Sequence, residues 1–242
     1  MPATASSARS ERPEAAPKKG GIRRAKEAQI LRAAERVFAR TGFAGARMAD
    51  IAAAARLPKP NLHYYFRSKR ALYRAVLANI LELWLAETDI IAADADPAAA
   101  LGHYVRAKMR FSRFYPDASR VFANEIIHGA PEIGGFLRQE LKALVERKSA
   151  AISAWVAERR MAPLDPRHLF FAIWAMTQTY ADFATQIEAV LGVPALGEDE
   201  FAAATEEVVR LVLRGCGLDG APKSRVSAAR PSRRRPPVGS SG

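Results

Sequence analysis

The 242-residue sequence has one cysteine, Cys216, and no long apolar run. A single cysteine cannot close a disulfide within the chain, which excludes a disulfide-stabilised scaffold. No segment reaches the ~18 consecutive apolar residues of a membrane-spanning helix, and the N-terminus has no apolar signal region. These absences favour a cytoplasmic protein without a membrane partner, and the length allows one or two domains with a sizeable core.

Signatures of catalysis and of metal binding are also missing. The histidines His63, His103, His128 and His168 are scattered and lack the spacing of metal ligands. Neither a nucleophile elbow nor a phosphate-binding loop is present. Cys216 lies between two glycines, near the predicted end of the last helix, and is better interpreted as a helix-end residue than as a nucleophile. The sequence therefore predicts neither an enzyme nor a bound cofactor or metal.

The positive charge is abundant but unevenly distributed. The net charge is +12, which indicates an anionic partner. Residues 1–26 are net +5, residues 27–74 are net +7, and residues 218–242 are net +5, whereas residues 75–217 are net −5. This asymmetry predicts a small module that faces nucleic acid, carried on a larger body that faces something else.

The two ends differ in composition from the rest of the chain. Residues 1–21 and 218–242 are rich in small, Pro and basic residues and show no hydrophobic period, so we predict disordered basic tails. They either keep the protein soluble or act as arms that add non-specific DNA affinity. Between them we expect a DNA-binding head over residues 22–74 and a ligand-binding and dimerisation body over residues 75–217.

Apolar residues recur at helical spacing along most of the chain, and no segment shows the alternation of a strand. Ser68, Asp96-Pro97 and Asp165-Pro166 are helix-start signals, and Gly42 is a stop signal. The sequence therefore predicts an all-α fold of about nine helices. They cover residues 23–40, 49–55, 59–65, a long helix from 68, 97–115, 116–129, 133–160, 166–190 and 198–214.

Residues 48–66 have the pattern of a helix-turn-helix, in which two short helices are joined by a tight turn. Ile51, Leu57 and Leu62 are spaced to share a core with Val37 and Phe38 of the preceding helix. The alternative is a generic helical hairpin whose basic residues form only a solvated face.

The second short helix would present residues suited to reading DNA. Asn61 can pair with adenine, and Lys59 can bond guanine or phosphate. Pro60 fits the first turn of a helix, and Arg47 and Lys69 are placed for backbone phosphates. The predicted DNA-binding residues are Arg47, Lys59, Pro60, Asn61, His63, Tyr64, Tyr65 and Lys69.

Residues 30–77 resemble the DNA-binding head of the TetR family of one-component regulators. The resemblance rests on Ala33-Ala34-x-x-x-Phe38, Gly42-Phe43, Asp50-Ile51-Ala52, Leu62-His63-Tyr64-Tyr65-Phe66 and Ser68-Lys69-x-Ala71-Leu72. The chain departs from the family pattern at Pro58, where a Ser is common, and at Arg47, where a Thr cap is frequent. The resemblance implies a homodimer that binds a palindromic, double-stranded operator and a small-molecule effector.

The body resembles the pyrimidine-sensing members of the same family, through residues 114–120, 129–131, 141–144 and 174–184. This resemblance extends over residues 22–217. It implies a repressor of pyrimidine-catabolism genes that releases DNA on binding uracil or thymine. The alternatives are a repressor of this type with a different small-molecule effector, and a largely non-specific architectural DNA binder.

A planar base needs an aromatic face and a few polar groups in an apolar pocket. Trp174 or Trp84 could stack on the ring, and the Gln178 amide could complement an imide edge. Each tryptophan could instead be plain core, and Thr177 could bond only its own helix. The predicted ligand-binding residues are Trp84, Asn124, Glu125, Trp174, Thr177 and Gln178.

Two further apolar stripes predict a four-helix dimer seam, although the first could also be core. The first stripe contains Leu169, Ile173, Met176, Tyr180, Phe183 and Ile187. The second, on the last helix, contains Phe201, Val208, Val209, Leu211 and Val212.

Overall fold

The computed structural model describes residues 19–85 and 89–218. These residues form helices and contain no β-strand, which confirms the all-α prediction. The elements are α1 (Lys19–Gly45), α2 (Met48–Ala54), α3 (Lys59–Tyr65), α4 (Lys69–Leu85), α5 (Pro97–Phe114), α6 (Pro116–Ile127), α7 (Gly134–Phe136), the π-helical turn η2 (Leu137–Leu141), α8 (Lys142–Ala157), α9 (Pro166–Asp182), α10 (Ala184–Leu191) and α11 (Glu198–Gly215).

Several boundaries differ from those predicted. Helix α1 begins at Lys19, inside the predicted tail of residues 1–21; residues 1–18 and 219–242 lie outside the described part of the chain. The predicted helix over 166–190 is divided at Phe183, whose backbone leaves the helical region (φ −119°, ψ 30°). The predicted helix over 133–160 is instead the succession α7, η2 and α8. These divisions account for the difference from about nine helices.

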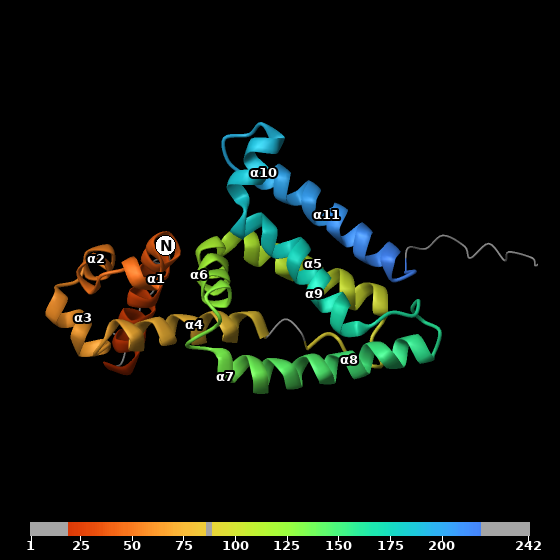
Figure 1. Cartoon of the computed structure of the whole chain (residues 1–242), viewed down its shortest axis with the longest axis horizontal. Coiled ribbons are helices and arrows are strands. Elements are labelled where there is room, and N and C mark those ends of the chain that lie inside the picture. The colour runs from red at the N-terminus through yellow and green to blue at the C-terminus, as the bar shows by residue number, and fades with distance from the viewer. Residues whose placement is uncertain (1–18, 86–88, 219–242) are drawn as a thin grey trace, which may run out of the picture.

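The head consists of α1, α2, α3 and the start of α4, at one end of the molecule (Figure 1). Val37, Phe38, Ile51 and Leu62 are all buried in one core, as the apolar spacing predicts. Gly42, which was predicted to end the helix, adopts φ 67°, a left-handed conformation that glycine tolerates because it has no Cβ. It kinks the helix there, and α1 continues to Gly45.

Helix α4 leads from the head to the body, and the two parts share apolar contacts (Figure 1). Its N-cap Ser68 accepts a hydrogen bond from the backbone N–H of Ala71 at 3.1 Å. Ala118 and Val121 of α6 belong to the same buried cluster as the head, because α6 packs against α1. The head is therefore in direct contact with the body through a second helix besides α4.

The body has its own core, formed mainly by α5, α8, α9 and α11. Trp155 of α8 is fully buried at its centre, and its indole N–H donates to the carbonyls of Ala92 and Ala93 at 3.1 and 2.9 Å. Helix α5 packs against both α9 and α11.

The structure places much of the predicted dimer seam inside this core. Ile173 of α9 and Phe201, Val208, Val209 and Val212 of α11 are buried within the same chain, because both helices pack on α5. They are therefore not available to a second copy. The large apolar side chains that stay exposed on α9, α10, α11 and the break at Phe183 are Phe171, Phe183, Val190, Leu191 and Leu211.

Substitution of the α5 cap tests the local basis of this architecture. The Asp96 carboxylate accepts the backbone N–H of Ala99 at 2.8 Å, ahead of Pro97 in the first turn. Asp96→Ala leaves that donor unsatisfied, so we expect the free energy of unfolding to fall by ~1 kcal/mol in urea denaturation followed by circular dichroism. Asp94→Ala, in the preceding turn, is the matched control; equal stability of the two variants would contradict the capping role.

Candidate functional site

The outer side of α3 is an exposed polar and aromatic surface. Pro60 lies in the first turn, and Leu62 anchors the helix because its side chain is fully buried in the head core. The exposed residues of the helix are Lys59, Pro60, Asn61, His63 and Tyr64. Tyr64 is 73 % exposed, which is unusual for a tyrosine and suits a surface that meets a partner.

The turn between α2 and α3 is fixed from α1. The Gln29 side-chain amide donates to the carbonyl of Ala55 at 2.7 Å. Arg56 follows with φ 53°, a left-handed conformation that costs a non-glycine residue roughly 1 kcal/mol. Arg47, the N-cap of α2, is exposed and makes no side-chain capping bond, so its guanidinium is available to an anion.

The structure assigns a different role to Lys69 and a partly different role to Tyr65. The Lys69 ammonium donates to the carbonyls of Ala44 and Ala46 at 3.2 and 2.9 Å and lies 4.7 Å from the centroid of the Phe43 ring. It therefore ties the end of α1 to α4, where the sequence suggested a phosphate contact. Tyr65 packs against the head core and is only partly exposed.

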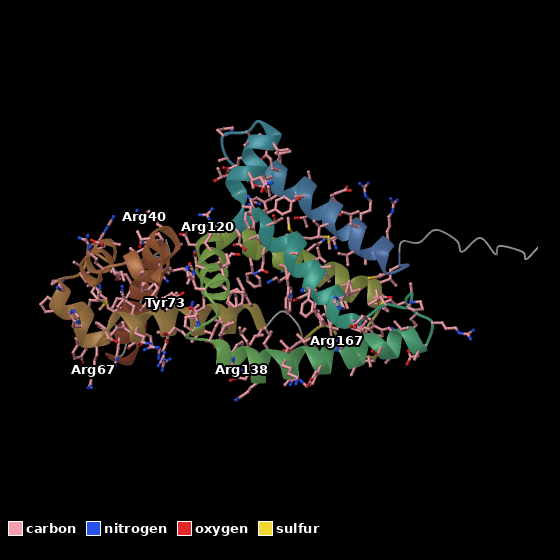
Figure 2. All side chains as sticks on the ribbon, viewed as in Figure 1. Arg40, Arg67, Tyr73, Arg120, Arg138 and Arg167 are labelled. Carbon is pink, nitrogen blue, oxygen red and sulfur yellow. The ribbon has the colours of Figure 1, made fainter. Side chains whose placement is uncertain are left out.

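Sequence reasoning missed two exposed cations, Arg56 in the turn of the helix-turn-helix and Arg67 just after it. Figure 2 places Arg67 on the head, near α3 and the start of α4. The sequence feature that could have revealed them is the net charge of +7 over residues 27–74. That charge includes both residues but does not show which cations face outward.

A cavity of about 380 Å³ lies where α4, α5, α6, η2, α8 and α9 meet. This volume is within the range of pockets that bind small molecules. The wall is mostly apolar and includes the predicted residues Trp84, Trp174 and Gln178. The full lining is Leu81, Trp84, Leu85, Tyr104, Lys108, Phe122, Ile126, Leu137, Leu141, Leu144, Trp174 and Gln178.

The polar groups of this cavity are few. The Trp174 indole N–H donates to the Tyr104 hydroxyl at 2.8 Å. Burial raises the pKa of Tyr104 to about 12, so its hydroxyl stays protonated near neutral pH. The Gln178 amide makes no hydrogen bond to another residue of the described ranges, and both its donor and its acceptor are therefore available to a ligand.

Lys108 is a cavity residue that the sequence reasoning did not identify. It is 5 % exposed, and its ammonium lies 4.3 Å from the centroid of the Trp84 ring. Burial lowers its pKa to about 8, against the smaller opposite effect of the Asp182 carboxylate. Leu101, Tyr104 and Lys108 recur at helical spacing on α5, so a lysine on the apolar stripe was the signal that could have revealed it.

Three predicted ligand contacts are not part of the cavity. The Glu125 carboxylate accepts the backbone N–H groups of Glu132 and Ile133 at 2.6 and 3.2 Å. The Asn124 amide donates to the carbonyl of Arg120 at 2.9 Å. Thr177 is fully buried, and its hydroxyl donates to the carbonyl of Ile173 at 2.7 Å. Asn124 and Thr177 thus bond carbonyls of their own helices, and Glu125 bonds the backbone of the loop before α7.

Cys216, possible metal ligands and possible membrane-spanning helices complete the search of the described residues. Burial raises the pKa of the Cys216 thiol to about 11, which keeps it in the unreactive thiol form. Within residues 19–85 and 89–218, no group of three or more His, Cys, Asp or Glu side chains could hold a metal ion. Over the same ranges, no helix is both long and apolar enough to cross a membrane.

An exposed helix-turn-helix carried on a separate helical body is the arrangement of a DNA-binding regulator. Residues 30–76 match the family model described as "Bacterial regulatory proteins, tetR family". Residues 77–219 match the model described as "YcdC-like protein, C-terminal region", which is a TetR C-terminal domain. The chain therefore belongs to the TetR family of transcription regulators.

Two individual regulators resemble the chain in sequence. RutR, a helix-turn-helix transcriptional regulator of Escherichia coli K12, is 48 % identical over 191 residues, which cover 79 % of this chain and 90 % of RutR. The repressor NicS of Pseudomonas putida is 33 % identical over 100 residues, or 41 % of this chain and 47 % of NicS. Because these relatives are transcription regulators, the chain is a DNA-binding regulator and not an enzyme.

Solved structures share the fold at low identity. The ketosteroid regulator KstR2 of Mycobacterium tuberculosis matches with a TM-score of 0.65 and 18 % identity, over 79 % of this chain and 94 % of KstR2. AibR, in complex with isovaleryl coenzyme A and operator DNA, matches with a TM-score of 0.61 and 20 % identity, over 77 % and 97 % of the two chains. These similarities establish the fold alone.

Substitutions on α3 separate base reading from phosphate binding. On an operator selected from random DNA by the wild-type protein, Asn61→Ala should weaken binding by ~1–3 kcal/mol and relax sequence preference at one position. Lys59→Ala should weaken binding to all sequences alike. It should also reduce by about one the salt slope, which is the slope of log affinity against log salt concentration. Both effects can be measured by fluorescence anisotropy across a salt series.

Lys142→Ala is the control for these α3 variants, because Lys142 is exposed on α8 of the body. It should leave both the affinity and the salt slope unchanged. If Asn61→Ala reduces affinity no more than Lys142→Ala does, α3 is not the base-reading helix.

Proposed function

We propose that this protein is a homodimeric repressor that binds a palindromic operator in the cytoplasm and releases it when uracil or thymine occupies the body. The observation that carries the proposal is the cavity, in which two indoles and a glutamine with a free amide line an otherwise apolar wall. The 48 % identity to RutR supports it, because the resemblance of the body is to pyrimidine-sensing regulators.

The cavity offers the contacts that a pyrimidine base needs. The Gln178 carbonyl can accept the ring N3–H while its NH2 donates to a neighbouring ring carbonyl. The Trp84 indole N–H is a buried donor with no acceptor among the described residues, so a ligand carbonyl would satisfy it. The Lys108 ammonium already lies over the Trp84 ring, which makes Trp174 the better surface for stacking.

Helix α4 connects this cavity with the head. Lys69, which holds the end of α1, and Trp84, which lines the cavity, lie on the same helix, about 22 Å apart along its axis. A ligand that displaces Trp84 therefore acts directly on the support of the head. Each tenfold loss of operator affinity requires the ligand to favour the non-binding state by ~1.4 kcal/mol.

A second connection runs through the loop before η2. Arg70 and Arg74 of α4 donate to the Glu132 carboxylate at 2.7 and 2.5 Å. Leu137 and Leu141 of η2, a few residues further along, line the cavity. A π-helical turn often marks a functional site, and here it joins the cavity wall to the head-supporting helix.

The dimer is supported by the apolar side chains that stay exposed on the body. Phe171, Phe183, Val190, Leu191 and Leu211 are each more than half exposed. Pairing two copies through this surface would cover these side chains and set the two reading helices one DNA turn, about 34 Å, apart.

A charge placed on this apolar surface should disrupt the dimer. Phe171 of α9 is 51 % exposed, and burying an unpaired carboxylate in its place would cost several kcal/mol. We expect Phe171→Asp to sediment as a monomer and to lose at least tenfold in operator affinity. Ile127→Asp on α6, at a side chain that is 75 % exposed, is the control and should stay dimeric. A dimeric Phe171→Asp would place the interface elsewhere.

Titration of the operator complex tests the effector. Uracil or thymine should release the DNA, and Gln178→Ala should raise the base concentration required by roughly ten- to hundredfold, because it removes the imide-pairing amide. Gln186→Ala, at an exposed position on α10, is the control. Release by neither base would leave a TetR-type repressor with another effector. Equal affinity for scrambled DNA would instead favour a non-specific architectural binder.

A further inference from the structure

Lys108 carries the only full charge in the wall of the ligand cavity. No ion pair or hydrogen bond joins its ammonium to another residue of the described ranges, and its nearest favourable contact is the Trp84 ring at 4.3 Å. A cation–π contact offsets only part of the cost of burying an ammonium. All three N–H donors of Lys108 therefore stay available to a molecule in the cavity.

The polar groups of the cavity differ in what they can distinguish. The Gln178 amide carries a donor and an acceptor and can be flipped, so it can pair with an oxo-imide edge or with an amino-imine edge. Lys108 and the Trp84 indole can only donate, and the indole N–H has no acceptor among the described residues. Uracil offers these two donors two ring carbonyls, whereas cytosine has one carbonyl and an amino group, so one donor would be left unpaired.

We propose that Lys108 is the specificity-determining residue of this cavity: its ammonium donates to the ring carbonyl oxygen that an amino group replaces in cytosine, and it thereby selects oxo-pyrimidines over aminopyrimidines. The proposal rests on the proposed function, because it names the group that restricts the class of base. A site built to hydrogen-bond a particular group rejects the analogue that lacks it strongly, since buried donors are then left unpaired.

The charged and titratable groups around Lys108 determine at which pH its ammonium loses a proton. The Asp182 carboxylate of α9 attracts the ammonium and raises the pKa of Lys108, against the larger effect of burial. The Arg120 guanidinium of α6 attracts that carboxylate in turn and lowers the pKa of Asp182. Tyr104 of α5 stays protonated near neutral pH. The cavity residues of α4, η2 and α8, and those of α6, are apolar or indole side chains.

The pH dependence follows from the protonation of Lys108. Burial lowers its pKa to about 8, so the charged donor is present below that pH and is lost above it. Affinity for uracil should therefore be constant on the acid side and fall as the pH rises through about 8.

The test is calorimetric titration of the full-length protein with uracil and with cytosine. Wild type should bind uracil at least tenfold more tightly. Lys108→Gln, whose amide can face either base, should reduce the uracil-to-cytosine ratio by about ten- to hundredfold, the value of a charged hydrogen bond. Lys108→Met should weaken uracil binding by a similar factor and abolish its pH dependence. Lys142→Gln and Lys142→Met are the matched controls on the exposed face of α8.

The outcomes separate the two proposals. If wild type binds neither uracil nor thymine, the pyrimidine proposal and the role of Lys108 in it both fail. If wild type binds uracil and cytosine equally, or Lys108→Gln keeps the full ratio, the Lys108 proposal alone is overturned. Should the variants fail to fold, as shown by circular dichroism, the wild-type protein still decides: uracil affinity that stays flat through pH 8 refutes the proposal.

Discussion

The structure depends on the fact that one helix, α4, is packed in two places. Leu72, Tyr73, Val76 and Leu77 are buried among the residues of the head, and Trp84 further along lines the cavity of the body. A packed helix is stiff, and its side chains fit their neighbours in discrete arrangements. Helix α4 therefore links the cavity wall to the head, as the proposed function requires.

Two glutamate carboxylates hold the loop before α7, which lies between the end of α6 and the cavity residues of η2. Glu125, at the end of α6, accepts two backbone N–H groups of the loop before α7 and is 3 % exposed. Glu132 of the same loop joins Arg70 and Arg74 of α4. The polar side chains Asn124 and Glu125 of α6 therefore bond backbone groups and do not line the cavity.

Lys108 shows how the proposed ligand site opposes stability. An ammonium inside an apolar wall, without an ion-pair partner among the described residues, destabilises the ligand-free protein. Because the folded state holds the lysine at a lowered pKa of about 8, this penalty is largest below that pH and diminishes as the pH rises toward the ordinary value of 10.5. A trade-off of this kind between stability and function is consistent with the ligand contact proposed for Lys108.

The sequence alone determined the helical class, the helix-turn-helix and the family, because these depend on local spacing: Ile51 and Leu62 must face the core, so Lys59, Asn61 and Tyr64 must face outward. Several helix starts, at Ser68, Asp96 and Asp165, were predictable for the same local reason. Trp84, Trp174 and Gln178 could be proposed as ligand contacts from residue type and resemblance, and the fold brings them to one cavity.

Only the tertiary structure decided the partners of each exposed or buried face. The Lys69 ammonium bonds two backbone carbonyls, and the Thr177 hydroxyl bonds a carbonyl of its own helix. The apolar face of α11 packs on α5 of the same chain rather than on a second copy. Helical periodicity shows that a face is apolar but not what covers it. Whether a lysine such as Lys108 reaches solvent or enters a cavity depends on how helices distant in sequence pack together, and no local pattern contains that information.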